Sequence, residues 1–342
     1  MTMRRVALLA AFGAGFAGAA TAQPAAEFYR GATIRLIVAA GSGESYDAAG
    51  RLVARHLGRF IPGNPKIVVE NMPGASGRVG ANYLYNVAPK DGLAIGGVLQ
   101  TSAMAQAIGE GGVRYDVARF HFLGSPITPT DVFAVRKTAG VASMEEARHR
   151  EVTIGSTGVT AQNYIFPALA NQLLGTKFKI VTGYNGGNDI NLAVERGEVH
   201  GRGAFPWGQL KATRPQWIST GEIVLLAQTG LTKDPELPNV PRLVDLAGTD
   251  EARRIFEFLS LTAEIGRPFV APPGVPQDRI DLLRAAFDAM MRDKEFLADG
   301  HHAMEEIVPK SASELEALVK RILEFDRPTV ERFKAILASL AK

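Results

Sequence analysis

The 342-residue sequence contains no cysteine, almost no excess of either charge, and no long apolar segment beyond its N-terminus. The absence of cysteine excludes disulfides, cysteine-ligated metal sites, thiol nucleophiles and a lipid-anchored N-terminal cysteine. A formal charge of +3, from 38 basic and 35 acidic residues, is too balanced for a nucleic-acid-binding protein. We therefore expect a globular protein, long enough for two domains, that does not bind nucleic acid.

The first 22 residues have the pattern of a secretory signal peptide. Arg4 and Arg5 precede an uncharged run of small and apolar residues, which ends in the A-x-A motif Ala20-Thr21-Ala22. A transmembrane anchor needs about 20 strongly apolar residues, and this run is shorter and rich in Gly and Ala. We predict cleavage after Ala22 and a periplasmic location. Cleavage removes two arginines and no acid, so the formal charge of +3 becomes about +1.

Strands and helices alternate along the rest of the chain. Continuous apolar runs predict buried parallel strands at 33–39, 66–70 and 93–99, with helices over 47–60 and 78–87 between them. The pattern recurs with strands at 152–155 and 178–181 and helices over 162–174 and 187–195, and ends in helices over 276–290, 293–298 and 311–336. Ser311 and Glu314 have the spacing of a capping box.

This alternation predicts an α/β fold with two doubly wound domains, joined by two crossings near residues 125–130 and 261–267. Such a chain begins one domain, inserts a second and returns to the first, which places a hinge and an interdomain cleft between them. We assign residues 28–125 plus 265–342 to domain 1 and residues 126–264 to domain 2.

The first glycine turn resembles a dinucleotide-binding fingerprint. Gly41 and Gly43 lie between a predicted strand and a predicted helix, and Glu70 ends the next strand, where such an acid holds the ribose. Against this, Tyr46 occupies the third glycine position, which normally allows the helix to pack closely. An NAD(P)-dependent oxidoreductase is therefore the weaker interpretation.

The same turn is also suited to an anion. The N–H groups of a glycine turn and of a helix N-terminus attract a carboxylate, and Ser42, Ser45 and Tyr46 add hydroxyl groups. Asp47 would repel an anion unless its carboxylate is used within the fold, and we predict that it caps its own helix. We favour this anion site over the dinucleotide site.

Several short blocks follow one another in a characteristic order. The block E-N-M-P-G-A-S-G at residues 70–77 follows the second strand, and A-P-K-D-G follows at 88–92. Further blocks are G-S-T-G at 155–158, G-Y-N-G-G at 183–187, L-P-N-V-P at 237–241 and V-A-P-P-G-V-P at 270–276. In this order the chain resembles the solute receptors of tripartite tricarboxylate transporters, the TctC or Bug family, over nearly its whole length after the signal peptide.

The resemblance implies a type II periplasmic-binding-protein fold that closes on a small organic carboxylate, either a di- or tricarboxylate or an aromatic acid. It implies delivery of this acid to an integral membrane permease with one large and one small subunit. We expect a monomer that captures its ligand without catalysis, cofactor or metal, since the sequence has neither H-E-x-x-H nor G-x-S-x-G. A ligand-sensing receptor that signals to a two-component sensor kinase is an alternative with the same fold.

Carried over by position, the resemblance assigns the ligand site to turns of both domains. The domain 1 candidates are Ser42, Gly43, Ser45, Tyr46, Asp47, Ala75, Ser76 and Gly77, with Thr101 and Ser102 at the cleft wall. The domain 2 candidates are Ser156, Thr157, Gly158 and Tyr184.

Three features depart from the family pattern or lie outside it. The usual proline-rich loop is replaced at residues 39–44 by a sequence that includes Glu44, which alters the charge of the turn. Phe205 or Trp207 is predicted either to shape the distal cleft or to be buried in the core of domain 2. The helical spacing of Arg51, Arg55 and Arg59 predicts a solvated face, with His56 at the surface, or else a contact with the permease or an anionic membrane surface.

Overall fold

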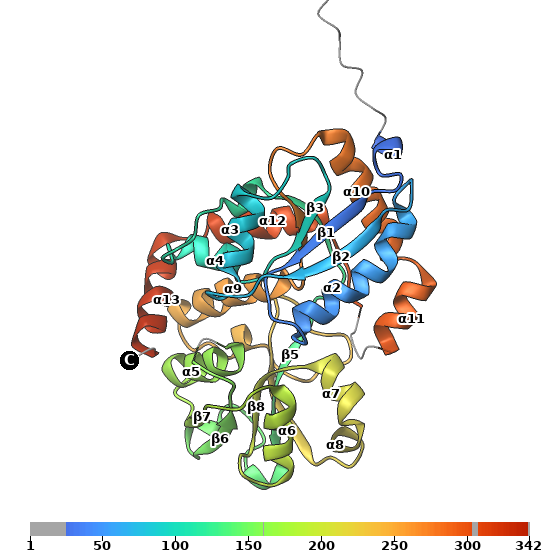
Figure 1. Ribbon diagram of the computed structural model, residues 1–342. Helices are drawn as coiled ribbons and strands as arrows, with labels where there is room; N and C mark the ends of the chain where they lie inside the picture. Colours follow the sequence, from blue (N-terminus) through green and yellow to red (C-terminus); the bar gives the residue numbers. More distant parts are fainter. Residues whose placement is uncertain (1–24, 160, 303–306, 341–342) are drawn as a thin grey trace, which may run out of the picture.

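The computed structural model describes residues 25–159, 161–302 and 307–340, which form two lobes, each built on one β-sheet (Figure 1). The predicted signal peptide, residues 1–22, lies outside the described residues. None of the helices in the described part of the chain has the length and apolar character needed to span a bilayer.

The sheet of the first lobe has six strands in the order β11-β4-β10-β3-β1-β2. β1 pairs in parallel with β2 and β3, whereas β10 runs antiparallel to both β3 and β4. The carboxyl ends of β1 to β4 and the amino end of β10 therefore lie along one edge. The strands are β1 (Thr33–Val38), β2 (Lys66–Asn71), β3 (Ala94–Gly97), β4 (His121–Ser125), β10 (Phe269–Ala271) and β11 (Lys310–Ser311).

Helices cover both faces of this sheet, as its continuously apolar strands predict. One face packs against α2 (Ser45–His56), α10 (Gln277–Met290) and α11 (Lys294–His302). The other packs against α3 (Arg78–Asn86), α4 (Ser102–Ala107) and α12 (Ala312–Leu323). The remaining helices of this lobe are α1 (Ala25–Phe28), α13 (Arg327–Leu340) and the short 3-10 helices η1 (Leu57–Phe60) and η2 (Val117–Arg119).

The sheet of the second lobe has five strands in the order β7-β6-β8-β5-β9. β6 is parallel to β7 and β8, and β5 is antiparallel to β8 and β9, so the amino end of β5 shares an edge with the carboxyl ends of the others. The strands are β5 (Asp131–Arg136), β6 (Val152–Gly155), β7 (Phe178–Val181), β8 (Gly201–Pro206) and β9 (Ile223–Gln228).

This second sheet also carries helices on both faces. One face packs on α5 (Gln162–Leu174), and the other on α6 (Gly187–Glu195), α7 (Trp207–Thr213) and α8 (Pro215–Ser219). The lobe also contains the short 3-10 helices η3 (Lys137–Ala139), η4 (Glu146–Arg148) and η5 (Leu243–Leu246). Two sheets with helices on both faces confirm the predicted α/β fold class.

Two segments connect the two sheets: residues 126–130 between β4 and β5, and residues 229–268 between β9 and β10, which include α9 (Asp250–Glu264) and end in the second crossing. They lie side by side, because the Arg267 backbone N–H lies 2.9 Å from both the Ile127 carbonyl oxygen and Ser125 Oγ. Gly266 has a φ of 68°, and a Cβ there would lie 2.2 Å from the Ile127 oxygen, so the position requires glycine. Since the first crossing joins the carboxyl end of β4 to the amino end of β5, the carboxyl edges of both sheets lie at the junction of the lobes.

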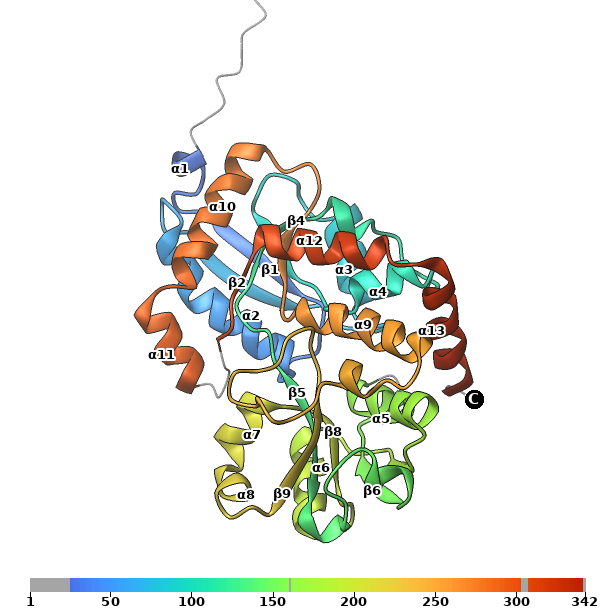
Figure 2. The same cartoon turned by 180° about the vertical axis from the view of Figure 1, so that it is seen from behind.

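The strands divide between the sheets at the two predicted crossings, but α9 packs with the last helices of the chain (Figure 2). Phe258 of α9 contacts the rings of Phe325 and Phe333, with centroids 5.1 and 5.4 Å apart. The predicted boundary at residue 264 assigns α9 to domain 2, whereas these contacts join it to helices assigned to domain 1. The domain boundaries themselves stay a prediction.

Several predicted elements differ from the structure at their ends. The helix predicted over 311–336 is two helices, α12 and α13, separated at residues 324–326, and the strand predicted over 93–99 is confined to Ala94–Gly97. The capping box is confirmed, because Ser311 Oγ accepts from the Glu314 N–H and the Glu314 carboxylate accepts from the Ser311 N–H.

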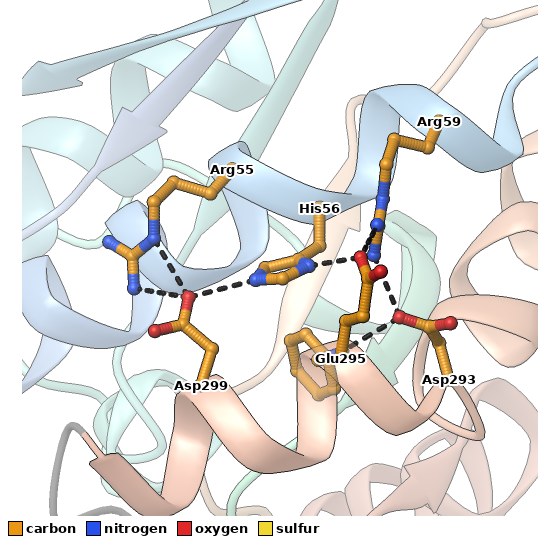
Figure 3. A network of polar contacts seen from close by, with 7 residues as sticks. Arg55, His56, Arg59, Asp293, Glu295 and Asp299 are labelled. Atoms are coloured by element: carbon orange, nitrogen blue, oxygen red, sulfur yellow. Dashed lines mark hydrogen bonds and ion pairs between the residues drawn. The ribbon is translucent and has the colours of Figure 1, made fainter.

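Arg51, Arg55 and Arg59 are exposed, as the predicted solvated face requires, and Arg55 and Arg59 also form ion pairs with acids in or just before α11 (Figure 3). Arg55 Nη2 lies 2.9 Å from Asp299 Oδ2, and Arg59 Nη2 lies 2.7 Å from Asp293 Oδ1. Arg59 also forms an ion pair with Glu295. These charges are therefore compensated within the fold.

His56 lies between these arginines and is buried, with 8% of its surface exposed. Its Nε2 lies 2.8 Å from Asp299 Oδ2, and its ring packs edge-on against Phe296 at a centroid distance of 5.5 Å. The prediction of a surface histidine was wrong. The helix that buries it comes 243 residues later in the chain, so the local helical pattern could not reveal it.

Candidate functional site

The first glycine turn, between β1 and α2, is held by acidic side chains of the chain itself. The Gly41 N–H donates to Glu44 Oε1 at 2.9 Å, and the Gly43 N–H donates to Asp47 Oδ2 at 2.8 Å. These two N–H groups are therefore bonded to side chains of the chain itself, and the anion site at this turn stays a prediction. The turn does bind carboxylates, as its chemistry predicts, but they belong to residues three and four positions further along the chain.

Asp47 is buried and accepts three hydrogen bonds. Besides the Gly43 N–H, its donors are Arg51 Nε and Asn71 Nδ2, each at 2.9 Å. Burial acts to raise the pKa of Asp47, but the hydrogen bonds from Arg51, Gly43 and Asn71 together lower it to about 2. The predicted capping role was wrong in detail, because the N-cap of α2 is Glu44 and Asp47 instead fastens the turn before it.

A cation that was not predicted from the sequence lies at the carboxyl edge of the first sheet. Arg267, in the second crossing, places its guanidinium carbon 4.4 Å from the centroid of the Tyr46 ring. Its Nη1 donates to Gln100 Oε1 at 3.0 Å, and its Nη2 lies 3.5 Å from Ser45 Oγ. Tyr46 Oη accepts from the Gln100 N–H at 3.0 Å, so two predicted site residues, Ser45 and Tyr46, join one polar cluster. The signal available in the sequence was a basic residue within a predicted crossing.

The loop after β2 has an unusual backbone. Ala75 and Ser76 have φ values of 47° and 52°, between Gly74 at 122° and Gly77 at 81°. The left-handed conformation costs a residue with a side chain roughly 1–2 kcal/mol, and such strain is concentrated at functional sites. The strained positions fall in the E-N-M-P-G-A-S-G block, and the side chains of Ala75 and Ser76 are exposed. Gly77 is buried as the N-cap of α3.

The turn after β6 is held together by Asn163, which was not predicted. Its Oδ1 accepts from Ser156 Oγ at 2.8 Å and from the Thr157 N–H at 3.2 Å. The Gly158 N–H donates to Ser156 Oγ at 3.3 Å. The structure thus brings the three predicted residues of this turn together, but Ser156 is fully buried and its hydroxyl serves the turn.

Three other predicted residues lie in loops or at helix ends. Thr101 is half-buried at the N-cap of α4, and Ser102 is buried, with its carbonyl accepting from the Tyr115 hydroxyl at 3.1 Å. Tyr184 is half-buried in the loop between β7 and α6.

Trp207 and Phe205 lie in the apolar core of the second lobe. Trp207 is 6% exposed and Phe205 1%, and the Trp207 indole N–H donates to Glu236 Oε2 at 2.6 Å. Burial in the core was one of the two positions that the sequence left open for these aromatic residues. A contact of Trp207 with a ligand stays a prediction.

A buried carboxylate lies at the junction of the lobes. Asp131, at the amino end of β5, is 4% exposed, and its backbone pairs with Thr229 through bonds of 2.8 and 3.2 Å. Burial raises the pKa of Asp131 to about 6, against the opposing effects of the Arg267 and Arg202 charges. Arg267 belongs to the second crossing and Arg202 to β8 of the second lobe. The positive charges of both arginines lower the pKa of Asp131 and so partly oppose the effect of burial.

Two cavities have been identified, and neither is lined by a predicted site residue. One, of about 430 Å³, is lined by the first crossing, the loop after β9, the end of α9 and Lys310. The other, of about 410 Å³, lies between α9 and the end of α12. In the part of the chain that the structure describes, no three His, Asp or Glu side chains are arranged to hold a metal.

Comparison with solved structures identifies the fold first as that of two-lobed periplasmic binding proteins, and more closely as that of the TctC and Bug proteins. A TctC solute-binding protein from Polaromonas has a TM-score of 0.67 at 18% identity, covering 91% of this chain and 99% of that one. The periplasmic binding protein BugD has 0.63 at 19%, covering 90% and 98%. An R. palustris protein solved with adipate has 0.60 at 20%, covering 90% and 97%. No family model and no curated protein sequence matches the chain.

Proposed function

We propose that this protein is a periplasmic solute receptor of the TctC/Bug family, which captures a small organic carboxylate for a tripartite tricarboxylate-type permease with a large and a small membrane subunit. The fold supports this proposal, since it matches TctC and Bug proteins over nearly the full length of both chains. One structure with this fold was solved with adipate. The pattern of a signal peptide at residues 1–22 supports the periplasmic location.

The observation that carries the proposal is the position of Arg267. A guanidinium binds a carboxylate through charge-assisted, paired hydrogen bonds. Arg267 lies where the carboxyl edges of the two sheets meet, its Nε has no partner among the described residues, and its Nη2 makes only a 3.5 Å contact with Ser45. In α/β proteins, ligands bind outside the carboxyl ends of the strands. A ligand carboxylate at Arg267 would also be within the polar cluster of Ser45 and Tyr46.

The glycine turn supplies a second element of the proposed site. Glu44 is exposed and its carboxylate is bound by the Gly41 N–H. In the proposed mechanism, an incoming carboxylate displaces Glu44 from this N–H group, and the two lobes then move about the crossing segments to enclose the ligand as a monomer.

A thermal-shift panel tests the proposal. The panel consists of acetate, succinate, malate, adipate, citrate, benzoate and terephthalate. A ligand at 100 times its dissociation constant stabilises the folded protein by about 2.7 kcal/mol, which raises the Tm by several degrees. We expect at least one member of the panel to give this rise in the wild type, and Arg267→Gln to abolish it.

The matched control is Arg332→Gln, which removes an exposed arginine whose partner is Glu251 on the outside of the first lobe. This variant keeps the full response. If no panel member raises the Tm of the wild type, the proposed function is wrong. Uptake of the bound acid by cells that carry or lack the gene tests the permease part of the proposal.

A further inference from the structure

Arg202, in β8, is a buried arginine with two guanidinium nitrogens that have no hydrogen-bond partner among the described residues. Only 8% of its surface is exposed, and its Nε and Nη1 atoms donate to no group of the described residues. The guanidinium carbon lies 4.5 Å from the centroid of the Phe205 ring. Unpaired buried donors are costly, above all on a charged group, so a side chain in this state requires another partner.

The guanidinium is directed at the N-terminus of α6. A Cβ built on Gly187, the first residue of this nine-residue helix, would lie 2.5 Å from Arg202 Nη1 and 2.9 Å from its Cζ. The first N–H groups of a helix have no acceptor within the helix and attract anions. Asp189, the acid in the first turn, is bonded to the Asn185 amide at 3.1 Å. Arg202 and the helix N-terminus therefore present two sources of positive potential at one point.

A second buried polar side chain lies on the same face of α6. Asn191 is four residues after Gly187, is fully buried, and neither its amide nitrogen nor its amide oxygen has a partner among the described residues. Two separate observations, on β8 and on α6, thus indicate hydrogen-bonding capacity that the protein does not use internally.

Asp131 is the acid whose charge acts on Arg202, but it does not satisfy these donors. Neither Nε nor Nη1 of Arg202 bonds to it, and its charge also acts on Arg267. Asp131 compensates part of the buried charge of Arg202. The donors of Arg202 remain available to an anion.

We propose that Arg202 and the N-terminus of α6 bind one carboxylate of a dicarboxylate ligand, while Arg267 binds the other. This inference rests on the proposed function and deepens it, because it assigns Arg202 as a specificity-determining residue and the ligand as a diacid. Arg202 lies in β8 opposite Ala134 of β5, and the carboxyl end of β8 pairs with Asp131 at the edge of the sheet that meets the crossing segments, where Arg267 lies. A diacid engages both guanidinium groups and so links the second lobe to the edge of the first, whereas a monoacid of equal chain length leaves one of them unpaired.

The test compares diacids with monoacids by isothermal titration calorimetry. The probes are the panel above, with butyrate added as the monoacid partner of succinate and hexanoate as that of adipate. We expect the wild type to bind a diacid more tightly than its monoacid. Arg202→Met should weaken diacid binding roughly 10- to 150-fold, the range for a lost hydrogen bond to a charged group. Arg202→Lys should restore part of that loss.

Two matched controls separate this role from a structural one. Arg136→Met removes an arginine at the opposite end of α6, where it donates to the Val194 and Glu195 carbonyls at 3.2 and 3.1 Å, and should leave diacid binding unchanged. Gly187→Ala keeps the charge but displaces the guanidinium and should weaken binding. Gly186→Ala, whose added Cβ meets no atom within 4 Å, should not. Ligand-free melting curves for each variant identify any that fail to fold.

The outcomes distinguish this inference from the function on which it rests. If no acid binds the wild type, both are wrong. If the wild type binds an acid and Arg202→Met or Gly187→Ala binds it equally well, or if monoacids and diacids bind alike, the diacid inference is overturned and the proposed receptor function stands.

Discussion

The buried acid at the junction of the lobes predicts a measurable pH dependence of stability. The pKa of Asp131 is raised from 3.8 to about 6, chiefly by burial. A carboxyl group whose pKa is raised by folding contributes most to stability when it is protonated in both states, and this contribution is lost as the pH rises through the folded pKa. This pKa shift corresponds to about 3 kcal/mol in the free energy of unfolding. The protein loses this stabilisation as the pH rises from about 4 to about 7.

The variant Asp131→Asn isolates this contribution, because an amide does not titrate. Urea unfolding of both proteins at pH 4, 5, 6 and 7 gives the difference in the free energy of unfolding at each pH, in which the contributions of all other groups cancel. We expect the wild type to lose about 3 kcal/mol relative to Asp131→Asn over this range.

Asp47→Asn is the matched control, because the same chemical change is made at a buried acid whose pKa is lowered to about 2. Asp47 is ionised in the folded and the unfolded chain above about pH 5, so the difference between wild type and this variant should be constant from pH 5 to pH 7. A difference for Asp131→Asn that is also constant from pH 4 to pH 7 would refute the argument from burial.

Three further predictions concern single residues of the fold. Glu44→Gln should tighten the binding of a responsive panel acid, measured by calorimetry, because it weakens the hold on the Gly41 N–H and removes a repelling charge; unchanged or weaker binding would contradict the displacement mechanism. Gly201→Ala should lower the free energy of unfolding by about 1–3 kcal/mol, because the added Cβ would lie 2.3 Å from the Ala134 backbone oxygen. Gly248→Ala is the control and should change the free energy of unfolding little, because its added Cβ would have no atom within 4 Å. Asp299→Ala should cost roughly 1–3 kcal/mol in urea unfolding because it leaves buried His56 without its acceptor; a Tm equal to that of the wild type would show that the contact contributes nothing.

Local patterns in the sequence were sufficient for much of the fold. The bounds of α5 and β7 agree with the helix predicted over 162–174 and the strand over 178–181, because apolar spacing and glycine turns are properties of consecutive residues. The alternation of strands and helices, with two crossings, likewise indicated two sheets with helices on both faces.

The parts that could not be predicted depend on contacts between distant residues. Arg267 meets Ser45 across 222 positions, and His56 meets Asp299 across 243. Burial of a charged side chain such as Asp131 or Arg202 is decided by which helices pack over it, and no local pattern records this. The hydrogen bonds within the glycine turn were missed for another reason. The turn is followed by two acids, Glu44 and Asp47, and the sequence does not say which carboxylate its N–H groups bind.

The place of β10 has a consequence for the order in which the chain folds. This strand, residues 269–271, lies between β3 and β4 in the middle of the first sheet. Until it emerges from the ribosome, the first sheet lacks an interior strand and cannot close. The second sheet has no such dependence, because all its strands come from residues 131–228. During synthesis, therefore, β1 can pair early with β2 and β3, whereas β3 and β4 each wait for β10 to supply the strand between them.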